Sequence, residues 1–147
     1  MTKHRKIKIY VGLPGSGKTT AALALINSED NWLRLNKDSI RDMLGFSVWN
    51  TQTESIVNSL QTTLLNKYMK EGYNIIIDNC HLSSSSKDNI LKSIAVYNGL
   101  NYDYDVEFQS FLEVPVEECI IRDSLRTRTV GKQVILSMYD KYIKPQQ

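Results

Sequence analysis

Cysteine, proline and long apolar runs are scarce in this sequence of 147 residues. The two cysteines, Cys80 and Cys119, lie far apart and in no metal-ligand spacing, which argues against a zinc site and favours reduced thiols. No apolar run approaches the roughly 18 residues that a membrane-spanning helix needs. The charged start, Met1 to Lys8, leads into an apolar stretch too short for a signal peptide. We therefore expect a cytoplasmic protein that does not associate with membranes.

A strong excess of charge of either sign is also missing. Eighteen lysines and arginines face 16 acidic residues, so the net charge is only +2. Proteins that coat long stretches of nucleic acid are usually more basic, which leaves room for a small local site that grips a few phosphates at a strand end. The length fits a single domain, residues 1–147, and no internal repeat or Pro/Gly-rich linker divides it.

Short apolar segments alternate with helical patterns along the chain. The expected strands are Lys6–Val11, Trp32–Asn36, Tyr73–Asp78 and Tyr104–Leu112, and the expected helices are Lys18–Asn27, Thr51–Glu71, Asp88–Asn98, Glu117–Arg126 and Gln133–Tyr142. Within the third strand, Ile75–Ile77 has the continuous β-branched character of a strand buried on both faces. Two helices carry apolar stripes, formed by Ile56, Leu60, Leu64 and Tyr68 in one and by Ile90, Leu91 and Ile94 in the other. This alternation predicts an α/β fold with one parallel sheet of about four strands and helices on both faces.

Residues 12–19, Gly-Leu-Pro-Gly-Ser-Gly-Lys-Thr, match the pattern G-x-x-x-x-G-K-[ST] in full. They follow an expected strand and open an expected helix, which is the setting of a phosphate-binding P-loop. Glycines let backbone N–H groups point at phosphate oxygens, and the helix N-terminus adds the positive end of its dipole. Lys18 would reach the β- and γ-phosphates of ATP, and the Thr19 hydroxyl would bind Mg²⁺. The expected nucleotide-binding residues here are Gly12, Pro14, Gly15, Ser16, Gly17, Lys18, Thr19 and Thr20.

Carboxylates follow the second and third expected strands, at the same edge of the sheet as the P-loop. Asp38 is suited to take a proton from an attacking hydroxyl, and Arg41, three residues later, to bind a phosphate on the acceptor. The alternative is an aspartate that caps a helix beside a surface arginine. Asp78 has the position of a carboxylate that holds Mg²⁺ directly or through water, or else it simply starts a turn. His81, in the loop that follows, is a polar surface residue or a substrate contact.

Three arginines lie close together near the end of the chain. Arg122 and Arg126 are four residues apart in an expected helix and so share one face, and Arg128 follows. Such a helix beside a P-loop predicts a lid that neutralises the triphosphate during transfer. The alternative is a solvated helix in which Glu118 and Asp123 pair with the arginines.

Taken in order, these segments resemble the kinase domain of the phage polynucleotide 5′-hydroxyl kinases. The matching segments are GLPGSGKTT, LNKDSIRDML, IIIDNCHL, VPVEECIIRDSLRTR and VILSMYDKY. The resemblance implies a P-loop NTPase fold with an arginine-bearing helical lid, ATP and Mg²⁺ as cofactors, and 5′-hydroxyl ends of DNA or RNA as acceptors. For a phage-encoded chain it implies the host cytoplasm. It covers the kinase domain only, so 3′-phosphatase activity is not expected, and no residue marks an oligomer interface.

The same resemblance implies a role for each site residue. Lys18 and Thr19 would bind the ATP phosphates and Mg²⁺, and Arg122 and Arg126 would hold the donor phosphates. Asp78 is expected to serve the metal and the substrate from its position after the third strand, not from the resemblance. Asp38 would be the general base on the 5′-hydroxyl, and Arg41 would bind the phosphate on the 3′ side of the terminal nucleotide. The residues expected to take part in the transfer itself are Asp38, Lys18 and Arg126.

Other functions remain open at this point. A related small-molecule kinase would use the same P-loop, base and lid on a nucleoside, sugar or antibiotic hydroxyl, but it would have less need of Arg41. A nucleotide-binding regulatory module without turnover would be expected to lack the base or the lid, and Asp38, Arg122 and Arg126 are all present. Passive nucleic-acid binding is disfavoured because no pattern of basic residues interleaved with aromatic ones stands out.

Overall fold

The protein has a four-stranded parallel sheet in the strand order β2-β3-β1-β4. The computed structural model describes residues 3–46 and 49–146, so both ends of the expected domain, 1–147, lie outside the described residues. The strands are β1 (Lys3–Val11), β2 (Trp32–Leu35), β3 (Asn74–Ile77) and β4 (Tyr102–Ser110). The predicted α/β fold is confirmed. β1 begins three residues earlier than expected because Lys3–Arg5 pair with Tyr102–Tyr104 of β4.

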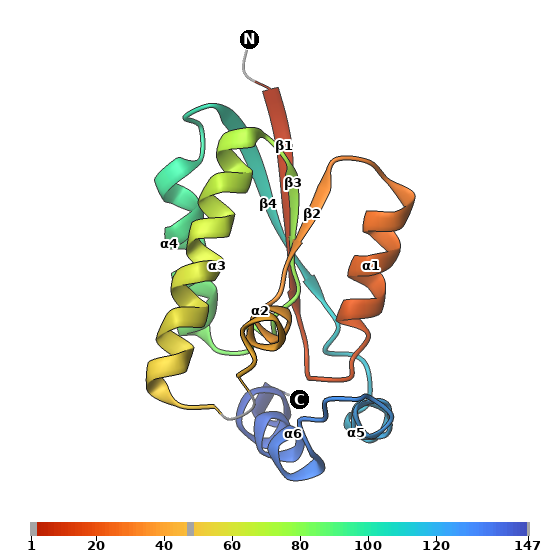
Figure 1. Cartoon of the computed structure of the whole chain (residues 1–147). Helices are drawn as coiled ribbons and strands as arrows, with labels where there is room; N and C mark the ends of the chain where they lie inside the picture. Colours follow the sequence, from red (N-terminus) through yellow and green to blue (C-terminus); the bar gives the residue numbers. More distant parts are fainter. Residues whose placement is uncertain (1–2, 47–48, 147) are drawn as a thin grey trace.

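Helices cover both faces of the sheet (Figure 1). On one side lies α1 (Lys18–Ser28), and on the other lie α3 (Thr51–Glu71) and α4 (Ser84–Tyr97). Three shorter helices, α2 (Lys37–Leu44), α5 (Val116–Ser124) and α6 (Lys132–Met138), gather beyond the carboxyl ends of the strands. A π-helical turn (Tyr139–Ile143) and a 3₁₀ turn (Lys144–Gln146) continue α6. Within the described ranges, no helix is long and apolar enough to span a membrane.

The core lies on both faces of β1 and β3, the two central strands. Ile75, Ile76 and Ile77 are all fully buried, as their continuous β-branched run predicts. Ile75 and Ile77 pack toward α3 and α4, whereas Ile76 packs toward α1 with Trp32. The alternation of side chains along a strand therefore supplies residues to two separate layers, one on each face of the sheet.

The buried stripe of α3 differs from the prediction by one residue. Val57, Gln61, Leu65 and Met69 are the buried positions, whereas Ile56 is 44% exposed. The stripe runs through a glutamine because the Gln61 side chain accepts a hydrogen bond from Asn79 Nδ2 (2.9 Å).

Helix α4 also differs from its prediction. It begins at Ser84 rather than Asp88, because the Ser83 side chain caps it by accepting from the Ser86 amide. Ile90 and Ile94 are buried as expected, but Leu91 is 39% exposed. Its buried face is therefore narrower than the sequence pattern indicates.

Candidate active site

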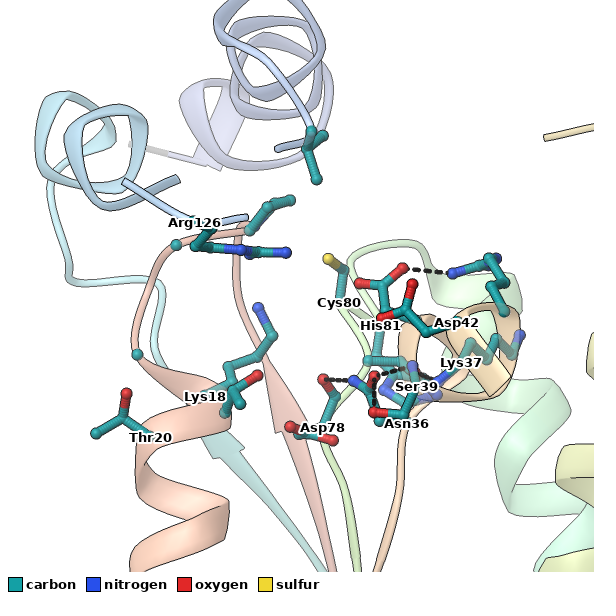
Figure 2. Close-up of a pocket in the computed structure, with 18 of the residues that line it drawn as sticks. Lys18, Thr20, Asn36, Lys37, Ser39, Asp42, Asp78, Cys80, His81 and Arg126 are labelled. Carbon is teal, nitrogen blue, oxygen red and sulfur yellow. Dashed lines mark hydrogen bonds and ion pairs between the residues drawn. The ribbon is translucent and has the colours of Figure 1, made fainter. Parts of the chain in front are cut away.

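A cavity of about 780 Å³ opens beyond the carboxyl ends of the strands, between the P-loop, α2 and α5. It brings together most of the predicted site residues: Pro14, Gly15, Gly17, Lys18, Thr19, Thr20, Asp38, Arg41, Asp78, Arg122 and Arg126. Gly12 and Ser16 do not line it. Figure 2 shows Lys18 and Arg126 on one side, Lys37, Ser39 and Asp42 on the other, and Asp78 and Asn36 at the floor. Parallel α/β sheets bind ligands at this end.

Two glycines of the P-loop are required by its geometry. Gly15 and Gly17 have φ angles of 81° and 99°, in the left-handed region that residues with a Cβ avoid. A Cβ on Gly15 would overlap the backbone carbonyl of Cys119, so the loop packs directly against α5. A Cβ on Gly17 would lie 3.4 Å from Arg122 Nη1, which places this arginine over the start of α1. The P-loop and the arginine-bearing segment therefore form one unit.

Lys18 is buried in the floor of this unit. Its ammonium donates to the carbonyl oxygens of Gly12 (2.9 Å) and Leu13 (2.7 Å) and to Ser16 Oγ (3.3 Å). Burial lowers the pKa of Lys18, and the nearby Cys80 and Asp78 partly oppose that shift. The loop carbonyls accept hydrogen bonds from the buried ammonium and hold the Lys18 side chain along the P-loop. Ser16 thus serves the site through Lys18, although it does not line the cavity.

Thr19 and Asp78 converge on a residue that the sequence analysis did not single out. Arg34 Nε contacts both carboxylate oxygens of Asp78 (3.1 and 3.0 Å), and Nη2 lies 2.8 Å from Asp78 Oδ2 and 3.3 Å from Thr19 Oγ1. A signal was present, because Arg34 stands between two leucines in a four-residue strand. A charge in such a place needs a partner.

The donor atoms of Thr19 and Asp78 fit a magnesium ion by their chemistry. A hydroxyl and a carboxylate are hard oxygen ligands, and Mg²⁺ in nucleotide sites takes one or two of these together with phosphate oxygens. Among the described residues, no group of three or more His, Cys, Asp or Glu side chains could hold a metal by itself. A metal that shares its ligands with a nucleotide is the kind that suits these two residues.

The acceptor side of the cavity is built on the first turn of α2. Asn36 caps this helix by accepting from the Ser39 amide (2.8 Å), and its own amide group donates to the Asp78 carbonyl (3.3 Å). The Lys37 amide donates to Asn79 Oδ1 (2.9 Å), which ties α2 to the loop after β3. These bonds fix the start of α2 relative to β3 and so hold Asp38 and Arg41 over the cavity.

Asp38 and Arg41 form an ion pair, with Arg41 Nη1 2.6 Å from Asp38 Oδ1. A second carboxylate, Glu54 of α3, grips the same guanidinium through both oxygens, with Arg41 Nε 3.0 Å from Oε2 and Nη2 in contact with Oε1. The hydrogen bond to Glu54 raises the pKa of Arg41, so the guanidinium is a permanent cation. Glu54 was missed because it is 13 residues away on another helix. Asp38 is half exposed toward the cavity, with its side chain 51% accessible.

The loop after β3 supports the site from behind. His81 is buried with a φ of 48°, and its Nδ1 lies 3.4 Å from the Tyr10 carbonyl oxygen. Burial lowers the pKa of His81 to about 4, so the ring is neutral at neutral pH. The expectation of a polar surface histidine is therefore wrong, because the chain turns inward beneath the P-loop, where the Cys80 carbonyl accepts from the Gly12 amide (3.1 Å).

The arginine segment reaches the cavity by a route that differs from the prediction. Helix α5 ends at Ser124, so Arg126 lies in the following loop and does not share a helix face with Arg122. The cause is Asp123, whose buried carboxylate accepts from the amides of Val130 (3.0 and 3.2 Å) and Gly131 (2.9 Å) and draws the chain back. Arg126 lies near this carboxylate, with 3.8 Å between Nη1 and Oδ1.

Both pairings of the solvated-helix alternative also occur. Arg122 Nε lies 3.1 Å from Glu118 Oε1, and Arg126 approaches Asp123, yet both arginines still line the cavity. Arg128 instead reaches across to α2, where it pairs with Asp42 and donates to the Phe46 carbonyl. The loop after α5 is therefore tied both to its own helix and to the acceptor side.

Comparisons with known proteins agree with this geometry. A chain of the Pnkp1/Rnl/Hen1 RNA repair complex is similar to all of this chain at 28% identity and a TM-score of 0.81, and this chain spans 47% of its length. A fungal RNA kinase (14% identity, TM-score 0.60, 99% of this chain and 66% of that one) shares the fold. So does a gluconokinase from Sinorhizobium meliloti (13%, 0.57, 98% and 78%).

The sequence itself carries the assignment to a family. No curated protein matches the chain significantly. Residues 7–145, nearly the whole chain, match the pattern of the AAA domain family. The P-loop fold, with its four-stranded parallel sheet and a cavity at the carboxyl edge, is the fold that P-loop kinases share. By its sequence, the chain belongs to the AAA domain family.

Proposed function

We propose that this protein is an ATP-dependent kinase that transfers the γ-phosphate to the 5′-hydroxyl end of DNA or RNA. The observation that carries the proposal is the pairing of Asp38 with an Arg41 that Glu54 holds in place, across one cavity from a complete P-loop. The similarity to a chain of an RNA repair complex supports a polynucleotide acceptor. The P-loop alone would support any nucleotide-dependent enzyme.

On the donor side, Lys18 and the P-loop amides bind the β- and γ-phosphates. Arg122 from α5 and Arg126 from the loop after it approach the same phosphates, where added positive charge favours a transition state with spread negative charge. Thr19 and Asp78, together with the nucleotide, would hold Mg²⁺, which would supply further neutralisation of the phosphate oxygens. The packing of Gly15 against α5 keeps the two sets of cations in register.

On the acceptor side, Asp38 accepts the proton of the 5′-hydroxyl while the hydroxyl oxygen forms a bond to the γ-phosphorus. The bond between that phosphorus and the β–γ bridging oxygen breaks, ADP leaves, and the proton on Asp38 passes to water. Arg41 uses one of its nitrogens on Asp38 and two on Glu54. It binds the phosphate on the 3′ side of the acceptor nucleoside with the N–H groups that these contacts leave over, while Glu54 keeps the guanidinium in position. An acceptor nucleoside that carries a phosphate on its 3′ side fits this arrangement.

The test compares acceptors that differ in one phosphate. Wild type and Arg41→Ala are given γ-labelled ATP with a 5′-hydroxyl oligonucleotide, a nucleoside 3′-monophosphate or the bare nucleoside. We expect kcat/KM for the nucleoside to be lower than for its 3′-phosphate by about tenfold or more, as for loss of a charge-assisted bond, and the variant to lose the difference. Equal transfer to the bare nucleoside, or transfer to sugars alone, would replace this proposal with a small-molecule kinase.

A further inference from the structure

Arg34 occupies the space between the two side chains that are suited to a metal. Its Nη2 atom lies 2.8 Å from Asp78 Oδ2 and 3.3 Å from Thr19 Oγ1. The remaining nitrogens are also engaged, with Nε on both Asp78 oxygens and Nη1 3.3 Å from Ser39 Oγ. The guanidinium thus joins the P-loop helix, β3 and α2 at the floor of the cavity.

The position of Arg34 in the fold makes this contact persistent. β2 pairs with β3 in parallel, and Arg34 stands opposite Ile76, two residues before Asp78. Its neighbours Leu33 and Leu35 fix the strand register, so the side chain emerges beside the carboxylate. Asp78 is 2% exposed, and Arg34 is its ion-pair partner within the described ranges. A buried carboxylate held in this way does not release its partner without a replacement charge.

A guanidinium and a metal ion cannot both use these oxygens. Mg²⁺ binds oxygen at about 2.0–2.1 Å and keeps an octahedral shell, so it needs the volume around Thr19 Oγ1 that faces Asp78. Arg34 Nη2 stands in that volume. Two cations a few ångströms apart also repel each other strongly where water is scarce. Lys18, which already faces Asp78, adds to this repulsion.

We propose that Arg34 competes with Mg²⁺ for Asp78 and Thr19 and so sets the Mg²⁺ concentration at which the protein takes up ATP. The proposal rests on the proposed function for the use of Mg²⁺ and ATP. Metal binding displaces the guanidinium from the carboxylate, and the ion takes over its role of neutralising Asp78. When nucleotide is present without Mg²⁺, the Arg34 guanidinium stays on Asp78 and neutralises it.

The test titrates MgCl₂ against binding of a fluorescent ATP analogue, with no acceptor present. The variants are Arg34→Ala, Arg34→Lys, and Lys67→Ala as a matched loss of one positive charge on the exposed end of α3, where Lys67 pairs with Glu71. We expect Arg34→Ala to lower the half-saturating Mg²⁺ concentration about tenfold or more, by the strength of a charge-assisted bond. Arg34→Lys keeps the charge but loses the two-point contact with the carboxylate, so its half-saturating Mg²⁺ concentration should lie between those of Arg34→Ala and wild type. Lys67→Ala should match wild type.

An unchanged or higher half-saturating concentration in Arg34→Ala overturns the proposal. Because this variant leaves a buried carboxylate without its partner and is less stable, melting temperatures with MgCl₂ alone give a second readout. We expect Mg²⁺ to raise the melting temperature of both Arg34 variants more than that of wild type, and an equal rise overturns the proposal. If wild type fails to bind the ATP analogue at any Mg²⁺ concentration, the proposed function fails, and the melting series with MgCl₂ alone still decides the competition.

Discussion

Replacing Asp123 with alanine tests how the arginine-bearing loop is held over the P-loop. The Asp123 carboxylate is 2% exposed and accepts from two backbone amides, those of Val130 and Gly131, at 2.9–3.2 Å. These bonds close the loop of residues 125–130, which carries Arg126 and Arg128. Without them, the two amides must find water.

The expected cost follows from these contacts. A hydrogen bond to a charged group contributes about 1.5–3 kcal/mol, so two such bonds correspond to roughly 3–6 kcal/mol. The loop lies at the surface and regains water when it opens, which offsets part of this, and we expect a loss of about 3 kcal/mol in the free energy of unfolding. Asp123→Asn keeps one acceptor oxygen and should lose about half as much. Because Arg126 loses its alignment, the affinity for ATP should also fall by about tenfold in Asp123→Ala.

Urea unfolding monitored by circular dichroism measures the first quantity, and a fluorescent ATP analogue measures the second. Asp88→Ala is the matched control, because Asp88 is an exposed aspartate on α4 and its loss should change stability by less than about 0.5 kcal/mol. A loss below about 1 kcal/mol in Asp123→Ala would refute the reasoning, since no buried anchor of this kind costs so little to remove. Full stability with weaker ATP binding would show that Asp123 aligns Arg126 without anchoring the loop.

Three further predictions concern other residues of the site. Gly15→Ala should lower the free energy of unfolding by about 1 kcal/mol more than Gly45→Ala, because both residues have positive φ but only Gly15 meets a backbone oxygen, and equal losses in denaturation would contradict this. His81→Asn should reduce the loss of unfolding free energy that occurs as the pH falls from 6.5 to about 4. Because burial lowers the pKa of His81, its neutral ring contributes full stability above pH 6.5, and as the pH falls toward 4 about 3 kcal/mol is lost. Parallel pH profiles for wild type and variant would show that the ring is not buried in the neutral form. Glu54→Gln should raise KM for the oligonucleotide by about tenfold with little change in KM for ATP, because it frees Arg41 to leave its position, and a rise in both would assign Glu54 a general structural role.

The fold and the donor half of the site follow from local patterns in the sequence. The alternation of strands and helices, the isoleucine run of β3 and the P-loop each depend on neighbouring residues, so the chain alone predicts them. The proximity of Asp38 and Arg41 could also be predicted from the sequence, because one helical turn separates them.

The parts that escaped depend on contacts between distant residues. Arg34 meets Asp78 across 44 positions, and Glu54 meets Arg41 from another helix. No spacing rule links such pairs, although an arginine between two leucines in a short strand indicates that a partner exists. The end of α5 at Ser124 was missed for the same reason, because Asp123 bonds to amides that lie seven and eight residues further along.

The central claim is that Asp38 accepts the proton of a 5′-hydroxyl while the P-loop delivers the γ-phosphate. The most direct measurement incubates the protein with Mg²⁺ and γ-labelled ATP beside a 5′-hydroxyl oligonucleotide and its 5′-phosphorylated counterpart, with Asp38→Asn in parallel. We predict label on the 5′-hydroxyl strand alone, with a rate at least about 100-fold lower in the variant and ATP binding unchanged. Label on neither strand while ATP still binds, or an undiminished rate in Asp38→Asn, would contradict the account.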